Sequence, residues 1–255
     1  MNKADYSKIA PLYDKGRALS EQSIDLWLEV ISRLAKASEG AKLLDIGCGT
    51  GRFSFPLATK LHYQVTGADF SKEMLEKARE KDTGGLVTWD IQDAQNLTYP
   101  DNSFDIVFMS HLLYHCDNPD KVIRECKRVL KVTGVLQVRH GSIEQIQSDP
   151  EHTFFPEALA VDKARIFSLG RMESCLRNAG FSDIVSEEIT QQTFVSGANH
   201  LERVKLKNTS TLTLITRDAF ERGVRKLEEY VSHHPTEDPW LLYDRMTLTA
   251  GYKRG

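Results

Sequence analysis

The stretch LLDIGCGTGRF, from Leu43 to Phe53, decides the fold class of this chain. An apolar run is followed directly by glycines at positions 47, 49 and 51. Glycine has no Cβ, so the backbone N–H groups of such a bend can approach a ligand closely. A strand followed by a glycine loop is typical of proteins that bind nucleotides, dinucleotides or sulfonium cofactors.

Two of these ligand classes fit the loop poorly. A phosphate-binding P-loop requires a lysine followed by serine or threonine after its last glycine, whereas Arg52 and Phe53 stand there. A dinucleotide loop has its third glycine three positions after the second, and that position is again Arg52. The P-loop is therefore excluded, and the dinucleotide alternative is weakened but stays open at this point.

The rest of the chain alternates short apolar runs with helical patterns, which predicts a mostly parallel sheet with right-handed crossovers. We expect strands at 42–46, 64–69, 86–91, 104–109, 135–138, 181–187 and 241–253, and helices at 20–37, 52–61, 72–81, 119–130, 169–179 and 198–232. We expect a single domain, 1–255, with an N-terminal helical cap at 1–38. Strand character resumes after the helical segment 190–238, so we interpret that segment as an insertion into the domain.

Composition limits the classes of function. The chain has 255 residues, of which 27% are charged, and a formal net charge of −3, so it carries no electrostatic footprint for nucleic acid. The N-terminal stretch MNKADYSKIAPLYDKG has no apolar core of the signal-peptide type, and no run reaches about 18 apolar residues. Four scattered cysteines favour a reducing compartment: Cys48, Cys116, Cys126 and Cys175. We expect a cytoplasmic protein without a membrane span.

Three motifs in order resemble those of class I S-adenosylmethionine-dependent methyltransferases: LLDIGCGTG, the acid of TGAD at Asp69, and DAQNLTYPDNSFDIVFMSHLLYH. The most similar group is that of the ubiquinone and menaquinone biosynthesis enzymes (methyltransferase type 11). The resemblance covers about residues 40–140 and is specific for the cofactor, S-adenosyl-L-methionine. It implies an α/β, Rossmann-like fold: a mostly parallel seven-stranded sheet with helices on both faces, an antiparallel last strand, and the insertion 190–238 as a lid.

The resemblance also implies how the cofactor is held. Gly47, Gly49 and Gly51 would line its methionine and ribose part, and Asp69, at the end of the second strand, would accept hydrogen bonds from both ribose hydroxyls. Asp45, inside the first strand, would accept from loop amides or from the cofactor ammonium group, and it would also pin the glycine turn.

The adenine site is implied by residues after the second and third strands. Asp93 would accept from the adenine amine and the Ala94 N–H would donate to a ring nitrogen, while Asp90 pairs with a loop group. Phe70 either lies against the adenine face or packs in the core. Met109, at the end of the fourth strand, completes the implied cofactor contacts.

The N-terminal stretch YSKIAPLYDKGR resembles a segment that folds over the cofactor in similar enzymes. Tyr13 and Arg17 would then meet the methionine carboxylate, for which an arginine is well suited. The alternative is an amphipathic surface helix in which Tyr13 packs and Arg17 is solvated.

Methyl transfer needs mainly alignment and exclusion of water, and it needs a base only when the acceptor retains its proton. His115 and His111, which follow the fourth strand, are the candidate catalytic residues, because they share one face if this segment is a helical turn. The alternative is a polar cap. With Cys116 they have the residue types of a metal site but lack a fourth ligand, so no metal is expected.

Arg139 and His140 follow the fifth strand and either orient an anionic acceptor or form a solvent-facing pair. We expect a methyltransferase with a small-molecule acceptor, acting as a monomer or homodimer without nucleic acid. The alternatives are a methyltransferase acting on RNA or protein, and a non-catalytic regulatory protein that binds the cofactor.

Overall fold

A sheet of seven strands in the order β3-β2-β1-β4-β5-β7-β6 forms the centre of the molecule. In this computed structural model, residues 14–147, 149–234 and 236–255 are described. The strands are β1 (Lys42–Ile46), β2 (Gln64–Asp69), β3 (Val87–Ile91), β4 (Phe104–Ser110), β5 (Leu130–His140), β6 (Ser182–Gln192) and β7 (Tyr243–Tyr252). The predicted Tyr13 contact and the first third of the predicted cap lie outside the described residues.

The strand directions place the site. Strands β1 to β5 are parallel, whereas β7 runs antiparallel to both β5 and β6. This confirms the predicted Rossmann-like α/β sheet with its antiparallel last strand. The chain winds outward from β1 to β3 and then returns to β4, so the topology switches between β1 and β4. Ligands bind at such a switch, beyond the carboxyl ends of the strands.

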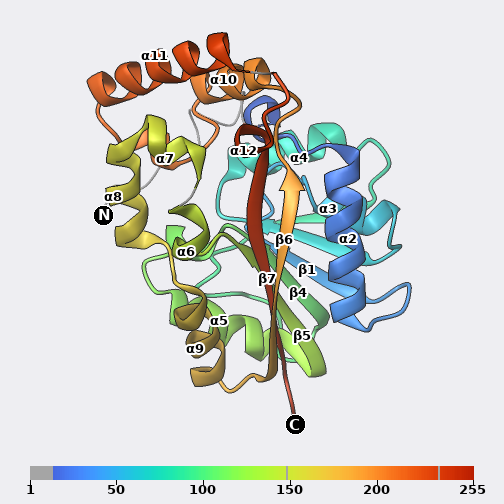
Figure 1. The fold of residues 1–255 in the computed structure, drawn as a ribbon. Coiled ribbons are helices and arrows are strands. Elements are labelled where there is room, and N and C mark those ends of the chain that lie inside the picture. The colour runs from blue at the N-terminus through green and yellow to red at the C-terminus, as the bar shows by residue number, and fades with distance from the viewer. Residues whose placement is uncertain (1–13, 148, 235) are drawn as a thin grey trace.

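Helices cover both faces of the sheet (Figure 1). On one face lie α2 (Glu21–Ala35) and α3 (Ser54–Thr59), and on the other α5 (Pro119–Val129) and α9 (Leu169–Asn178). The short α4 (Lys72–Lys81) packs beside β2 and β3.

Two helices start at capping residues where the sequence predicts a helix, whereas the helix predicted at 198–232 is divided into Gly197–Lys205 and Arg217–His233. Ser20 accepts a hydrogen bond from the Ser23 N–H at 3.1 Å, and Asn118 accepts one from the Lys121 N–H at 3.0 Å. Such side-chain caps satisfy N–H groups that the first turn of a helix leaves unbonded.

The apolar side chains of β4 divide between the two faces. Phe108 packs with α2 and α3, while Val107 and Met109 pack with α5 and α9. Successive side chains of a strand point to opposite faces, so a strand that is buried on both sides is apolar throughout. The side chain of Met109 is fully buried in this core.

A second group of helices lies over the carboxyl end of the sheet (Figure 1). It consists of α6 (Ile143–Ile146), α7 (Pro150–Phe154) and α8 (Pro156–Arg165) after β5, and α10 (Gly197–Lys205), α11 (Arg217–His233) and α12 (Pro239–Leu242) between β6 and β7. We call this group the helical layer. It has a core of its own, formed by Phe154, Phe155, Ala158, Val204, Leu212, Leu227 and Leu241.

The sequence analysis missed part of this arrangement. Helices α6 to α8 were not predicted. The first two have only four and five residues, and α8 lacks an apolar stripe, because only Ala158 and Asp162 among its ten residues are buried. Strands β5 and β6 are also longer than expected, so β6 runs to Gln192, inside the segment predicted as an insertion. Among the described helices, none is both long and apolar enough to cross a membrane.

Candidate functional site

The glycine loop after β1 has a backbone that only glycine adopts readily. Gly47, Gly49 and Gly51 have φ angles of 71°, 57° and 83°, in the left-handed region. A Cβ at Gly51 would also lie 2.7 Å from the rings of Phe55 and Trp89. The loop is therefore a bend in which bare backbone faces the carboxyl edge of the sheet.

Asp69 ends β2 beside this loop and holds it in place. Its Oδ2 accepts from the Gly49 N–H at 2.9 Å, and its Oδ1 accepts from the Ser71 N–H at 2.8 Å. Each carboxylate oxygen has a second lone pair, so both can still accept from a neighbouring pair of hydroxyls. Burial raises the pKa of Asp69, and the backbone donors oppose that shift. The two acceptor oxygens of Asp69 therefore fit the pair of ribose hydroxyls of the expected cofactor.

Asp45 pins the glycine turn as predicted, but it does so through a side chain and not through a loop amide. It is 2% exposed and accepts from the Ser54 hydroxyl at 2.6 Å, at the start of α3. Among the described residues no loop amide donates to it, because Asp69 takes the amide of Gly49. Asp45 therefore ties strand to helix on either side of the turn. Burial raises its pKa to about 7.

The residues expected at the adenine lie at the same edge. Phe70 is 78% exposed, so the core-packing alternative is wrong and its ring is available to a flat ligand. Asp93 follows β3 and accepts from the Gln95 N–H at 2.9 Å. Asp90 accepts from the Tyr99 hydroxyl at 2.9 Å, which confirms its pairing with the following loop. Ala94 packs against the core.

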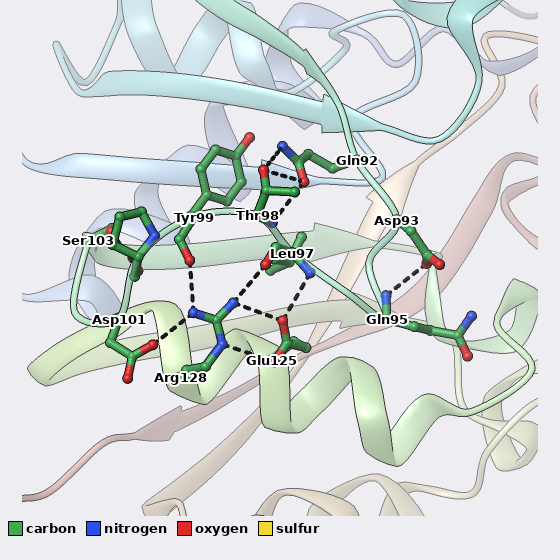
Figure 2. A network of polar contacts seen from close by, with 11 residues as sticks. Gln92, Asp93, Gln95, Leu97, Thr98, Tyr99, Asp101, Ser103, Glu125 and Arg128 are labelled. Carbon is green, nitrogen blue, oxygen red and sulfur yellow. Dashed lines mark hydrogen bonds and ion pairs between the residues drawn. The ribbon is translucent and has the colours of Figure 1, made fainter.

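A polar network fixes the loop that carries Asp93 (Figure 2). Arg128 on α5 donates to the carbonyls of Leu97 and Tyr99, both at 2.8 Å, and forms an ion pair with Glu125. Glu125 in turn accepts from the Leu97 N–H at 2.9 Å. Figure 2 shows Asp93 apart from this network, so the loop is held while that carboxylate stays outside the ion pairs.

The start of the described chain lies over the glycine loop. Arg52 donates to the Arg17 carbonyl at 2.8 Å, and the Thr50 hydroxyl donates to Asp14. Asp14 also forms an ion pair with Lys81 at 3.0 Å, so this segment bridges the loop and α4. This position agrees with the cofactor-covering interpretation of Arg17, while Tyr13 lies outside the described residues.

A cavity of about 510 Å³ lies between the carboxyl edge of the sheet and the helical layer. Arg52, next to the glycine loop, and His111, after β4, belong to its lining. Most of the remaining lining comes from the segment at 17–19, from β5 to β7, from α6 to α8 and from α10 with its following turn, and Tyr114 and Trp240 add to it. The cavity thus adjoins the loop and is partly covered by the helical layer.

The two candidate catalytic histidines are not equivalent. His111 has a φ of 56°, so 111–115 is not a single helical turn and the expected shared face is absent. His111 lines the cavity, whereas His115 belongs to the short helix η1 (Leu113–His115) and is not among the lining residues described. Burial and nearby arginines hold the pKa of His111 well below its usual range.

Arg139 is buried in the wall of the cavity, so the solvent-facing alternative is wrong. It is 1% exposed, donates to Gln191 Oε1 at 2.8 Å and lies 4.4 Å from the Trp27 ring. Its neighbour His140 is 4% exposed and contacts the Thr249 hydroxyl at 3.0 Å. Alternation along β5 therefore turns only the arginine toward the cavity.

Several lining residues were not predicted. Arg203 on α10 donates to the carbonyls of Gly16 and Thr193 at 2.7 and 2.6 Å. Glu151 on α7 is 7% exposed and accepts from the Thr209 hydroxyl at 2.8 Å. The sequence did hold a signal, because Asp-Pro at 149–150 is a helix start. Within the described ranges, no group of three or more histidine, cysteine or acidic residues could hold a metal ion.

Comparisons with known proteins agree with this geometry. A family model described as a methyltransferase domain matches residues 44–138. The chain is 27% identical over 249 residues to 27-O-demethylrifamycin SV methyltransferase of Amycolatopsis mediterranei (strain S699), covering 92% of this chain and 86% of that protein. It is 30% identical over 198 residues to methyltransferase GfsG of Streptomyces halstedii, covering 76% and 68%.

The fold is shared with solved structures. One is phosphoethanolamine N-methyltransferase 2 of Haemonchus contortus in complex with S-adenosyl-L-methionine, with a TM-score of 0.62 and 21% identity. The match covers 96% of this chain and 57% of that one, so the chain spans little more than half of that structure's length.

Proposed function

The chain belongs to the S-adenosylmethionine-dependent methyltransferases, and we propose that it methylates a small-molecule acceptor held in the cavity. One observation carries this proposal. The cavity of about 510 Å³ adjoins the glycine loop and is roofed by the helical layer. Sites for small molecules are commonly clefts of about 300–1,000 Å³. The name of the rifamycin-type relative supports the same class of acceptor.

The residues at the sheet edge fit the cofactor. Asp69 would hold the ribose hydroxyls, Asp93 the adenine amine, and Phe70 the adenine face, with the glycine loop beside the methionine part. When bound, S-adenosylmethionine supplies an electrophilic methyl group on a positively charged sulfur. Because His111 and Arg52 lie in the cavity wall next to this edge, the methyl group would face the cavity.

The protein's own contribution is alignment and exclusion of water. A displacement at the methyl carbon requires the acceptor atom to be in line with the bond that breaks. Holding the acceptor there removes the entropy cost of bringing two molecules together in that orientation. The helical layer partly covers the cavity, and the Arg139–His111 pair fixes one wall of it. The proposed role of His111 is to orient the acceptor through its second nitrogen.

The test follows a radiolabelled methyl group. Purified protein is incubated with methyl-labelled S-adenosylmethionine and with separate small-molecule, RNA and protein fractions of a cell extract. We expect label in the small-molecule fraction alone. A variant that fills the cavity, Ile146→Trp, should abolish that transfer while it leaves the affinity for S-adenosylhomocysteine unchanged. Label in RNA or protein would favour the macromolecular alternative, and binding without any product would favour the regulatory one.

A cytoplasmic location belongs to the same proposal. All four cysteines are free, which supports a reducing compartment. The net charge of −3 supports an enzyme that acts without a nucleic-acid partner. A monomer or homodimer is the assembly we propose for it.

A further inference from the structure

We infer that the acceptor is a zwitterion, whose carboxylate or phosphate group lies against Arg139 and Arg203 and whose ammonium group lies against Asp149 and Glu151. This inference names the substrate class of the cavity and rests on the proposed function. It is carried by the distribution of charge around one cavity.

The first pole of the cavity is formed by buried arginines. Arg203 is 7% exposed, and its described partners are the carbonyls of Gly16 and Thr193 and the ring of Phe194 at 4.6 Å. Burial lowers its pKa to about 10. A guanidinium buried against carbonyls and rings gains strongly from an added oxyanion, which it can bind through two N–H groups.

Three further arginines belong to this pole. Arg139 contacts Gln191, Ser110 and the Trp27 ring, and its charge also interacts with that of Asp244. The charges of Arg17 and Arg52 both lower the pKa of Arg203, which places them on the same side of the cavity. The arginines gather where the N-terminal segment, the glycine loop, β5 and α10 meet.

The second pole is formed by carboxyl groups at the start of α7. Glu151 accepts from Thr209 through Oε1, and its Oε2 has no hydrogen-bond partner in the described ranges. Asp149 accepts from the Glu151 N–H at 2.8 Å. Burial raises the pKa of both groups, and the charge of the neighbouring His152 opposes that shift without reversing it.

A neighbouring acid shows the contrast. Asp162 accepts from His152 at 3.0 Å and from Arg165 at 3.1 Å, so its charge is compensated within the protein. No lysine or arginine that the structure describes forms such a pair with Asp149 or Glu151. An ammonium group of the ligand would give this pole the partner that buried charge requires.

Asp244 lies between the two poles. It accepts from the Thr193 hydroxyl at 2.6 Å and interacts electrostatically with Asp149 on one side and with Arg139 and Arg203 on the other. Six arginines and four acidic side chains line the described cavity. Arg165 pairs with Asp162 and Arg245 with Glu188, whereas Arg203 and Glu151 make their described hydrogen bonds to neutral groups. A ligand with two opposite charges satisfies both ends at once.

The test uses unbranched ω-amino carboxylates of increasing length as a molecular ruler. Each is titrated by calorimetry into full-length protein saturated with S-adenosylhomocysteine, beside the matched alkylamine, the matched carboxylate and the matched ω-amino phosphate ester. We expect one length to bind about 10-fold or more tightly than either singly charged compound, since one charge-assisted hydrogen bond contributes about 1.5–3 kcal/mol. The comparison with the phosphate ester shows whether the arginines bind a carboxylate or a phosphate more tightly.

Matched variants assign the poles. Arg203→Gln should weaken the binding of the carboxylates about 10-fold and leave the affinity for the alkylamines unchanged. Glu151→Gln should weaken the binding of the alkylamines about 10-fold and leave the affinity for the carboxylates unchanged. Arg33→Gln, which breaks a surface pair with Glu187, is the control and should change neither. If Arg203→Gln no longer binds S-adenosylhomocysteine, Arg139→Gln takes its place.

The inference is overturned if uncharged analogues of equal length bind as tightly, or if both variants weaken every compound equally. Its failure differs from failure of the proposed function. Methyl transfer to a neutral small molecule would overturn the inference of a zwitterionic acceptor and leave the proposed function standing. Binding of a zwitterion without methyl transfer to any small molecule would overturn the proposed function and leave the zwitterionic binding site standing.

Discussion

The guanidinium of Arg139 donates a hydrogen bond to Nε2 of His111, with 2.7 Å between the two nitrogens. A guanidinium has no lone pair to offer, so Nε2 must be the acceptor and the ring proton must reside on Nδ1. His111 is therefore neutral, and its basic nitrogen is already in use. It can donate to an acceptor through Nδ1–H, but it is badly placed to take a proton.

Asparagine at position 111 should preserve this role. His111→Asn keeps one acceptor and one donor and tolerates the left-handed backbone, so kcat should fall less than about 10-fold, whereas His111→Ala should lose about 100-fold. The rate should show no histidine inflection between about pH 5 and 8. An inflection near the ordinary histidine pKa that disappears in His111→Asn would establish a general base instead.

Alanine substitutions at two glycines with similar φ angles distinguish the cost of backbone strain from the cost of steric crowding by a Cβ. Gly40 has a φ of 79° and open space where a Cβ would lie, whereas a Cβ at Gly51 would meet Phe55 and Trp89 at 2.7 Å. Gly40→Ala should cost about 1 kcal/mol of unfolding free energy from the left-handed backbone alone. Gly51→Ala should cost about 3 kcal/mol, because overpacking adds to the strain, and should also weaken S-adenosylhomocysteine binding. Urea unfolding measures the free energy of unfolding, and calorimetry measures the affinity for S-adenosylhomocysteine. An equal loss of unfolding free energy in the two variants would show that crowding at Gly51 contributes nothing.

Asp69 should act through the ribose hydroxyls. Asp69→Asn should weaken S-adenosylhomocysteine about 30-fold, since hydrogen bonds to a charged group contribute about 1.5–3 kcal/mol. The loss should shrink to a few-fold for the 2′,3′-dideoxy analogue, which lacks both hydroxyls. Asp105→Asn is the control, because Asp105 pairs with Lys131 at the opposite end of the sheet. An undiminished loss with the dideoxy analogue would show that Asp69 matters only for the loop.

Asp45 should make stability depend on pH. Its folded pKa of about 7 lies above the unfolded value near 4, so the folded state retains a proton that the unfolded state has lost. The free energy of unfolding should therefore fall as pH rises from about 4 to 7, by at most about 1.4 kcal/mol per unit from this group. Asp45→Asn can still accept from Ser54 and should remove that part of the slope. Parallel curves for the two proteins in urea unfolding would contradict the assignment.

The sheet could be predicted because its strands are buried on both faces. Runs such as Phe104–Met109 are apolar almost throughout, and caps such as Asn118 with Pro119 mark the helices between them. Helices α6 to α8 escaped prediction because α6 and α7 have only four and five residues and α8 has no apolar stripe. Two of their starts nevertheless carry a local signal, in Asp149-Pro150 and in Ser142 with Gln145, which form a capping box.

The site was predictable only where it follows the strands. Asp69, Asp93 and Arg139 come directly at or after strand ends, so topology alone brings them together. Arg203 and Glu151 reach the cavity on the helical layer, and their position depends on how that layer packs. The spacing of His111 and His115 misled for a local reason, since a left-handed residue interrupts the turn.

The most direct measurement is a crystal structure of the complex with S-adenosylhomocysteine. We expect both ribose hydroxyls within about 3.2 Å of the Asp69 carboxylate, and the sulfur facing the cavity beside His111. A ribose bound away from Asp69, or a sulfur that faces bulk solvent instead of the cavity, would contradict both the cofactor site and the acceptor site.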